Sequence, residues 1–266
     1  MKLLFLGTGA ADWDPAQAHL GDEKALQRRT TSVLVNGDLL IDPNPAVPEA
    51  MASFGADRHS VRNVLISHSH GDHYSPDTLL WLAEDHPVTV YGDGGYPQKL
   101  PRHPNLTFVA VKLGQSFEAG GYEVTAIPST HTVEESSEQA LHYLLSRDGR
   151  HLFYGCDGAW MLPTAFEMLS TRRYDCMILD ATFGADAQLY RIPGGKIFFY
   201  HNNTTMLQML RAAFLNAGCA DDRTVFVADH LARAYFPDGE RAKMAFQPLG
   251  FVPAYDGMTL MLDAGR

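Results

Sequence analysis

His68-Ser69-His70-Gly71-Asp72-His73 is the stretch of the sequence that decides its interpretation, because four side chains able to bind a metal fall within six residues. In extended backbone, residues i and i+2 project to the same face, so His68 and His70 can hold one cation together. Gly71 permits a sharp turn, after which Asp72 and His73 point to a second position nearby. The hexad predicts a metal site, and the competing interpretation is a solvated histidine-rich loop.

Three more residues of ligand type follow predicted strands. His131 comes just after a strand expected to end at residue 127, Asp157 follows the strand at 151–154, and His230 follows the strand at 224–227. Each of them alone could be a helix cap or a solvated loop residue. Together with the hexad, we expect all three to bind metal.

The fold class follows from short apolar runs of about four to eight residues, which are bounded by Gly, Pro, Asn or Asp and predict buried strands. These runs are residues 2–6, 31–35, 39–42, 63–66, 88–91, 106–111, 122–127, 140–145, 151–154, 176–179, 196–200 and 224–227. Apolar residues at helical spacing predict helices over 76–84 and 205–217, with two more over 46–54 and 240–246. The mixture predicts an α/β fold with sheets face to face and helices outside. Without a repeat or a polar linker, residues 1–266 are expected to form a single domain.

Composition narrows the classes of partner. The 266 residues include 21 Lys and Arg against 31 Asp and Glu, a net charge of −10, which argues against a general nucleic-acid coat without excluding nucleic acid. Three cysteines without a Cys-x-x-Cys pair favour a reducing compartment. No apolar run approaches the roughly 18 residues of a membrane span. We therefore expect a cytoplasmic protein that does not enter membranes, and a homodimer stays open.

The hexad, followed in order by His131, Asp157 and His230, resembles the metallo-β-lactamase fold of binuclear hydrolases. The resemblance implies an αββα sandwich of four layers, with two mixed β-sheets and the metals at one edge. It also implies the ligands: His68, His70 and His131 for the first metal; Asp72, His73 and His230 for the second; Asp157 bridging both.

Within that superfamily, the sequence is most similar to phosphodiesterases, namely the ribonuclease that processes tRNA 3′ ends and the cyclic phosphodiesterase of phosphonate metabolism. Four shorter segments carry this similarity: Leu6-Gly7-Thr8-Gly9, Arg29-Thr30-Thr31-Ser32, the run 178–183 (Ile-Leu-Asp-Ala-Thr-Phe) and His201-Asn202-Asn203-Thr204. The chain also departs from both enzymes. It has no basic tRNA-clamping arm and no N-terminal zinc knuckle, Arg233 stands where a histidine is expected, and Gly158 follows Asp157. These departures leave the substrate open.

The ligand set determines the expected chemistry. Nitrogen and carboxylate ligands without thiolate favour two Zn²⁺ ions, with Mn²⁺ and Fe²⁺ as alternatives. Two such ions make the pocket positive and select a small anionic substrate, and a hydroxide shared by the metals is expected to attack phosphorus. Asp72 is counted as catalytic as well as metal-binding.

His201 beside Asp180 is the candidate proton relay to the leaving oxygen. The alternatives are that His201 is a turn residue ahead of a helix cap at Asn203 or Thr204, and that Asp180 only orients a ligand histidine. Arg29 and Asn202 are candidates for substrate binding, although an exposed charge beside Arg28 is the favoured interpretation of Arg29.

The most favoured function is a phosphodiesterase acting on a small nucleotide-like or cyclic phosphate ester. The alternatives are hydrolysis of a lactone, thioester or β-lactam at the same centre, or a metal-bearing protein that binds nucleotide or RNA without turnover. Residues 13–29 are expected to form either a flap over the site or a surface loop.

Overall fold

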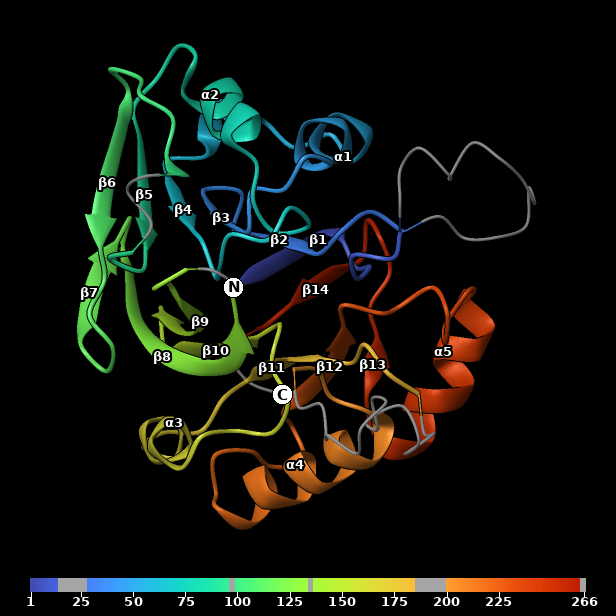
Figure 1. Cartoon of the computed structure of the whole chain (residues 1–266). Coiled ribbons are helices and arrows are strands. Elements are labelled where there is room, and N and C mark those ends of the chain that lie inside the picture. Colours follow the sequence, from blue (N-terminus) through green and yellow to red (C-terminus); the bar gives the residue numbers. More distant parts are fainter. Residues whose placement is uncertain (14–27, 96–98, 134–135, 185–199, 264–266) are drawn as a thin grey trace.

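The computed structural model describes residues 1–13, 28–95, 99–133, 136–184 and 200–263, and within them two seven-stranded sheets lie face to face (Figure 1). The first sheet has the order β14-β1-β2-β3-β4-β5-β6, and the second has the order β13-β12-β11-β10-β9-β8-β7. The strands of the first sheet are β1 (Lys2–Gly7), β2 (Ser32–Val35), β3 (Leu39–Ile41), β4 (Asn63–Leu65), β5 (Val88–Gly92), β6 (Leu106–Ala110) and β14 (Thr259–Met261). Those of the second are β7 (Ser116–Ala119), β8 (Tyr122–Thr132), β9 (Gln139–Arg147), β10 (Arg150–Gly155), β11 (Cys176–Asp180), β12 (Val225–Asp229) and β13 (Val252–Pro253).

Both sheets follow the same pattern of strand directions. From β14 to β3 the neighbours in the first sheet pair antiparallel, and from β3 to β6 they pair parallel. In the second sheet the pairs from β7 to β10 are antiparallel and those from β10 to β13 are parallel. Parallel strands end at a common edge, so the loops that follow β3 and β4, and those that follow β10, β11 and β12, are gathered at the edges of their sheets.

Helices cover the outer face of each sheet (Figure 1). α1 (Val47–Ser53) and α2 (Pro76–Ala83) pack on the first sheet, and α3 (Pro163–Leu169), α4 (Thr204–Asn216) and α5 (Gly239–Phe246) pack on the second. Two short 3-10 turns, Arg58–Ser60 and Gln247–Leu249, precede β4 and β13. The expected four-layer αββα sandwich is confirmed. Among the described residues, no helix is both long enough and apolar enough to cross a membrane.

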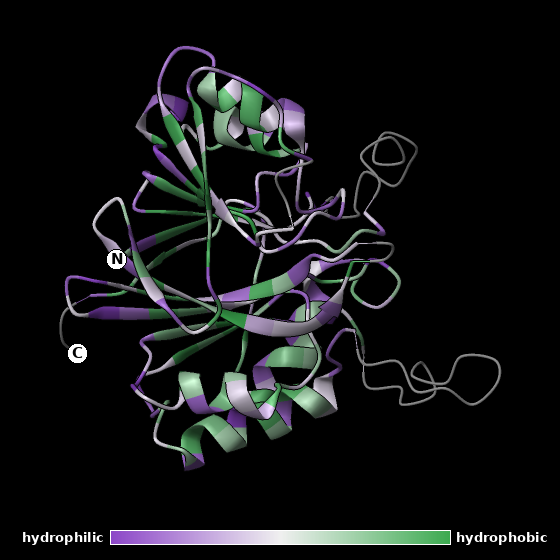
Figure 2. Cartoon of the chain, turned by 60° about the vertical axis from the view of Figure 1, so that its left-hand side comes forward, coloured by the Kyte–Doolittle hydropathy of each residue, from purple (hydrophilic) through white to green (hydrophobic). Residues whose placement is uncertain are grey.

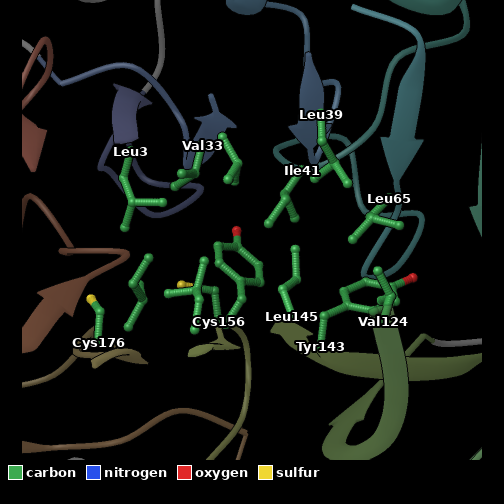
Figure 3. Packing of buried hydrophobic residues seen from close by; sticks show 14 of the residues in the cluster. Leu3, Val33, Leu39, Ile41, Leu65, Val124, Tyr143, Leu145, Cys156 and Cys176 are labelled. Carbon is green, nitrogen blue, oxygen red and sulfur yellow. The ribbon is translucent and has the colours of Figure 1, made fainter. Parts of the chain in front are cut away.

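The main core fills the space between the two sheets. Leu3, Val33 and Ile41 of the first sheet face Tyr143 and Cys156 of the second, and all five are buried (Figure 3). In Figure 2, where hydrophobic residues are green, much of the strand backbone between the two layers of helices is green. Full burial of an apolar side chain of this size stabilises the fold by about 1.5–3 kcal/mol relative to leaving it exposed, so this layer holds the two sheets together.

Several elements differ from the sequence-based expectation. β8 continues to Thr132 instead of ending at residue 127, and its pairing with β9 shifts register between Pro128 and Thr132. Four elements were not predicted from the sequence, namely β7, β13, β14 and α3. The three strands are short, and α3 has only seven residues and no side-chain cap. The strand expected at 196–200 lies outside the described residues apart from Tyr200.

Candidate metal centre

The predicted ligands meet where the carboxyl ends of strands from both sheets face one another. The hexad follows β4, Asp157 follows β10, His230 follows β12, and His131 lies within the last residues of β8. Backbone N–H groups of His73 and Tyr74 donate to the carbonyl of His70, which closes the turn that brings Asp72 and His73 back. All seven predicted ligands are therefore brought together.

The first group of ligand atoms consists of His68, His70, His131 and Asp157. Nε2 of His68 lies 3.0 Å from Nδ1 of His70, which lies 3.1 Å from Nε2 of His131. Oδ2 of Asp157 is 3.4 Å from His68 Nε2 and 3.6 Å from His131 Nε2. Atoms bonded to one tetrahedral zinc ion at about 2.1 Å are about 3.4 Å apart, so this spacing fits a single ion.

The second group consists of Asp72, His73, His230 and the same Asp157. Nε2 of His73 is 3.3 Å from Nε2 of His230, and Asp72 Oδ2 is 3.6 and 3.4 Å from these two nitrogens. Asp157 approaches His73 with Oδ2 at 3.3 Å and His230 with Oδ1 at 3.0 Å. Because Asp157 belongs to both groups, the arrangement fits two metal ions that share one carboxylate.

Hydrogen bonds on the far side of the rings fix which nitrogen is free to bind metal. Nδ1 of His131 lies 3.3 Å from the carbonyl of Tyr200, and Nδ1 of His73 lies 2.9 Å from Asp42 Oδ2. Both partners can only accept, so each Nδ1 carries the hydrogen and each Nε2 presents a lone pair to the centre.

Hydroxyl groups do the same for the other two rings. Ser67 Oγ donates to Asp42 and therefore accepts from Nδ1 of His68, at 3.0 Å. Thr182 Oγ1 donates to Asp180 and accepts from Nδ1 of His230, at 2.8 Å. Four rings thus direct lone pairs inward, which is the donor arrangement a divalent ion requires.

Charge in the buried centre also favours cations. Burial lowers the pKa of His68 to about 3, which keeps this ring neutral. Burial opposes ionisation of Asp157, but the nearby rings of His230, His73 and His201 outweigh it, and the pKa of Asp157 lies well below its usual value. Burial lowers the pKa of His230, yet Asp157 outweighs it and raises that pKa to about 10, so without metal this ring holds a proton at Nε2, and a bound ion would take its place at the lone pair. The two carboxylates of the centre, the partly exposed Asp72 and the buried Asp157, therefore attract positive charge, which two divalent ions would supply.

Backbone conformation at the centre is unusual. Asp42, Asp157, Trp160 and His230 have positive φ, between 55° and 60°, and all lie in loops around the site. Such conformations are uncommon for residues other than glycine and are concentrated at functional sites, where the surrounding contacts enforce them. At Asp157 the carbonyl is held by Ser129 Oγ and by His142 Nε2. The protein thus fixes the shared carboxylate from its backbone outward.

Asp180 and His201 form the expected pair. Nδ1 of His201 lies 2.6 Å from Oδ2 of Asp180, which is fully buried at the end of β11. The His201 ring stacks on that of His230, with centroids 5.3 Å apart. Asn203 caps α4 by accepting from the N–H of Met206, as the turn-residue alternative for His201 expected. His201 precedes this cap, and it also lines the cavity beside the centre.

The two residues predicted to bind substrate lie elsewhere. Asn202 is buried, and its amide is used within the protein: it accepts from the N–H of Trp160 and donates to the carbonyl of Asp180. Arg29 bonds to Glu49 on the surface and lies over the ring of Phe54. Neither lines the cavity, so the structure offers no support for a substrate contact by either, and Arg29 is a partly buried charge paired with Glu49 and Asp256. Of the expected flap, residues 14–27 lie outside the described residues.

The Leu6–Gly9 turn is shaped by close contacts between backbone segments. A Cβ atom at Gly7 would lie 2.0 Å from the carbonyl oxygen of Thr30, so only glycine fits where the backbone of β1 approaches that of Thr30. The N–H groups of Thr8 and Gly9 both donate to the carbonyl of Arg29. They are thus not free to cradle a phosphate.

Sequence reasoning missed the residues that orient the ligands. Asp42 is fully buried and accepts from His73, from Ser67 and from the hydroxyl of Tyr154. Thr182 links Asp180 to His230. For Asp42, the one available signal was its position directly after β3. This strand pairs parallel with β4, and the hexad follows β4.

A cavity of about 410 Å³ opens beside the centre. Its polar floor includes His70, His131, Asp157 and His201, and its wall is formed by small and aromatic residues: Ala10, Ala11, Ala232, Ala234, Phe183, Tyr200 and Tyr235. This volume lies within the range of about 300–1,000 Å³ that is typical of sites for small molecules.

Comparison with known proteins agrees with this geometry. Residues 38–227 match the family model described as the beta-lactamase superfamily domain. The chain is 25% identical over 162 residues to Ribonuclease Z of Oenococcus oeni, covering 51% of this chain and 46% of the relative, so it matches only about half of that protein's length.

Among solved structures, Zn²⁺-bound PqqB from Methylobacterium extorquens is similar with a TM-score of 0.72, 20% identity and coverage of 98% of this chain and 100% of that one. Human tRNase Z, short form, is similar with a TM-score of 0.69, 18% identity and coverage of 99% and 100%. At these identities the likeness shows the fold. The family match spans well over half of the chain, and with the two histidine and aspartate clusters it identifies the protein as a metal-dependent hydrolase of the metallo-β-lactamase superfamily.

Proposed function

We propose that this protein is a binuclear phosphodiesterase acting on a small nucleotide-like or cyclic phosphate ester. The observation that carries the proposal is the position of His201, which is paired with the buried Asp180 and lines the same cavity as members of both metal-ligand groups. Two divalent ions at these groups, Zn²⁺ or alternatively Mn²⁺ or Fe²⁺, would supply Lewis-acid activation of water and of a phosphoryl oxygen.

His201 is proposed to donate the proton that the leaving oxygen requires. Its Nδ1 is bonded to Asp180, so Nε2 is the nitrogen available to the cavity. Asp180 is itself fixed by the N–H and hydroxyl of Thr182 and by the N–H of Gly158. An imidazole oriented in this way can protonate an alkoxide as it departs, a contribution of about 10²–10⁴ in rate.

The cavity wall supports the substrate class. Phe183 and Tyr235 meet edge to face, with centroids 5.8 Å apart, and alanines form much of the remaining surface. Two bound metal ions would make the polar floor cationic. An aromatic and apolar wall next to such a floor suits a phosphate ester with a flat organic group, such as a nucleoside. The Ribonuclease Z relative is consistent with phosphodiester chemistry, although the net charge of −10 favours a small substrate over structured RNA.

The test is hydrolysis of bis-p-nitrophenyl phosphate, followed by a screen of cyclic nucleotides, with Zn²⁺- or Mn²⁺-loaded protein. We expect turnover that is lost in Asp157→Asn and retained in Asp148→Asn. Asp148 is the matched control because it is also an aspartate with positive φ, but its side chain is 90% exposed. Absence of phosphodiester hydrolysis by protein shown to hold two metals would refute the proposal. Lactone hydrolysis that persists at full rate in His201→Ala would instead favour carbonyl chemistry.

A further inference from the structure

A second group of histidine and aspartate side chains lies at the opposite end of β4 and β5 from the metal centre. His59 belongs to the 3-10 turn Arg58–Ser60, which precedes β4, and Asp85 and His86 lie between α2 and β5. The hexad follows the carboxyl end of β4, whereas these three residues precede the amino ends of β4 and β5. Since β4 and β5 are parallel, the group occupies the other edge of the first sheet.

The spacing of these three residues matches one metal ion. Oδ1 of Asp85 lies 3.2 Å from Nδ1 of His59 and 3.0 Å from Nδ1 of His86. Ligand atoms from all three residues lie within 4.8 Å of one another. Ligand atoms around a tetrahedral zinc ion are about 3.4 Å apart, close to these distances and to those in the centre described above.

The hydrogen bond on the far side of His86 determines the state of its Nδ1. Nε2 of His86 lies 2.9 Å from the carbonyl oxygen of Val61, which can only accept, so Nε2 carries the hydrogen. In the neutral ring, Nδ1 then presents a lone pair to the carboxylate oxygen of Asp85. Two acceptors at 3.0 Å repel unless positive charge lies between them, and that charge is either an added proton or a metal ion.

A neighbouring guanidinium orients the carboxylate of Asp85. Arg58 lies 3.1 Å from Oδ2 of Asp85 and 2.7 Å from Glu84, which turns Oδ1 of Asp85 toward the two rings. The His86 ring is nearly buried, while the His59 and Asp85 side chains are 52% and 47% exposed, so an ion can enter from solvent.

From this arrangement we propose that His59, Asp85 and His86 bind a third divalent transition-metal ion, of the Zn²⁺ type, with water completing its coordination. Two imidazoles and one carboxylate favour Zn²⁺ over Mg²⁺ or Ca²⁺, which prefer all-oxygen sites. The ion would join the turn before β4 to the turn before β5, away from the catalytic cavity.

The experiment measures zinc per chain in purified protein equilibrated at about 10 µM free Zn²⁺, which saturates a site with a dissociation constant near 1 µM. We expect Asp85→Asn to bind one ion fewer than the unmodified protein. Glu84→Gln is the matched control, because it removes the same charge one residue away, also from a partner of Arg58, and it should retain every ion. His59→Ala, at a half-exposed side chain that folding tolerates, should also lose one ion.

The difference of one ion does not depend on how completely the catalytic centre fills, so the result is separate from the proposed function. Equal zinc content in the unmodified protein, Asp85→Asn and His59→Ala would overturn the inference. Loss of one ion in Glu84→Gln as well would also overturn it, because it would reflect general surface charge.

Discussion

The two sheets contribute differently to the edge that they share. The first sheet presents all four of its ligands in one continuous hexad, with Asp42 directly behind His73 and, through Ser67, behind His68. The second sheet contributes from five separate places, and these include the shared carboxylate Asp157 and both members of the Asp180–His201 pair. This difference suggests a division in which the first sheet mainly fixes the metals and the second also controls turnover.

The most severe test of this division is Asp157→Asn. Asparagine tolerates the positive φ of 55° at this position, so the substitution removes charge without changing the backbone preference. We expect phosphodiester hydrolysis to fall by at least about a thousandfold, since both metal sites lose their common carboxylate. Steady-state kinetics together with metal content would check this, and activity within tenfold of that of Asp148→Asn would contradict the assignment.

His201→Gln should affect turnover without loss of metal. The rate with an alkyl leaving group should fall by about 10²–10⁴, because an alkoxide needs the donated proton, and the rate with p-nitrophenolate should fall much less. His103→Gln, at a loop histidine that accepts from the N–H of Asn105, is the control. An equal loss for both leaving groups would show that His201 supports the structure of the site instead of donating a proton.

Asp42→Asn tests the first sheet. Removing the carboxylate behind His73 and Ser67 should weaken metal binding by about 10–100-fold, the range typical of partners that orient metal ligands. With saturating metal, most of the activity should return. Competition with a chromogenic chelator measures the affinity, and unchanged affinity would show that the first sheet holds metal without help from Asp42.

Thr182→Val is expected to have the smallest effect. It removes the hydroxyl that joins Asp180 to His230 while keeping the branched shape of the side chain. Each of these two buried hydrogen bonds contributes about 1 kcal/mol, so kcat should fall by at most about thirtyfold. A change of more than a hundredfold would mean that Thr182 contacts the substrate.

The sequence contained much of this site, because metal ligands must be particular residue types and the carboxyl ends of parallel strands converge. The hexad and its order relative to His131, Asp157 and His230 were therefore sufficient to predict which side chains meet. Asp42 was not predicted, since a lone aspartate after a strand looks like any turn residue. Asn202 was assigned to substrate although its amide is turned into the protein, a side-chain direction that local sequence does not encode.

The same reasoning explains the outcome for the fold. Apolar runs of about four to eight residues with clear boundaries predicted the central strands. In contrast, β13 and β14 have two and three residues and gain their geometry from the neighbours that they pair with. The extension of β8 to Thr132 depends on pairing with β9 across a shift in register, which a window of sequence cannot reveal.

Anomalous scattering at the zinc edge, from crystals of the zinc-loaded protein, examines the shared edge most directly. Two peaks are predicted there, one bounded by His68, His70 and His131, the other by Asp72, His73 and His230, with Asp157 in contact with both. A single peak, or two peaks of which only one contacts Asp157, would contradict a centre built around one shared carboxylate.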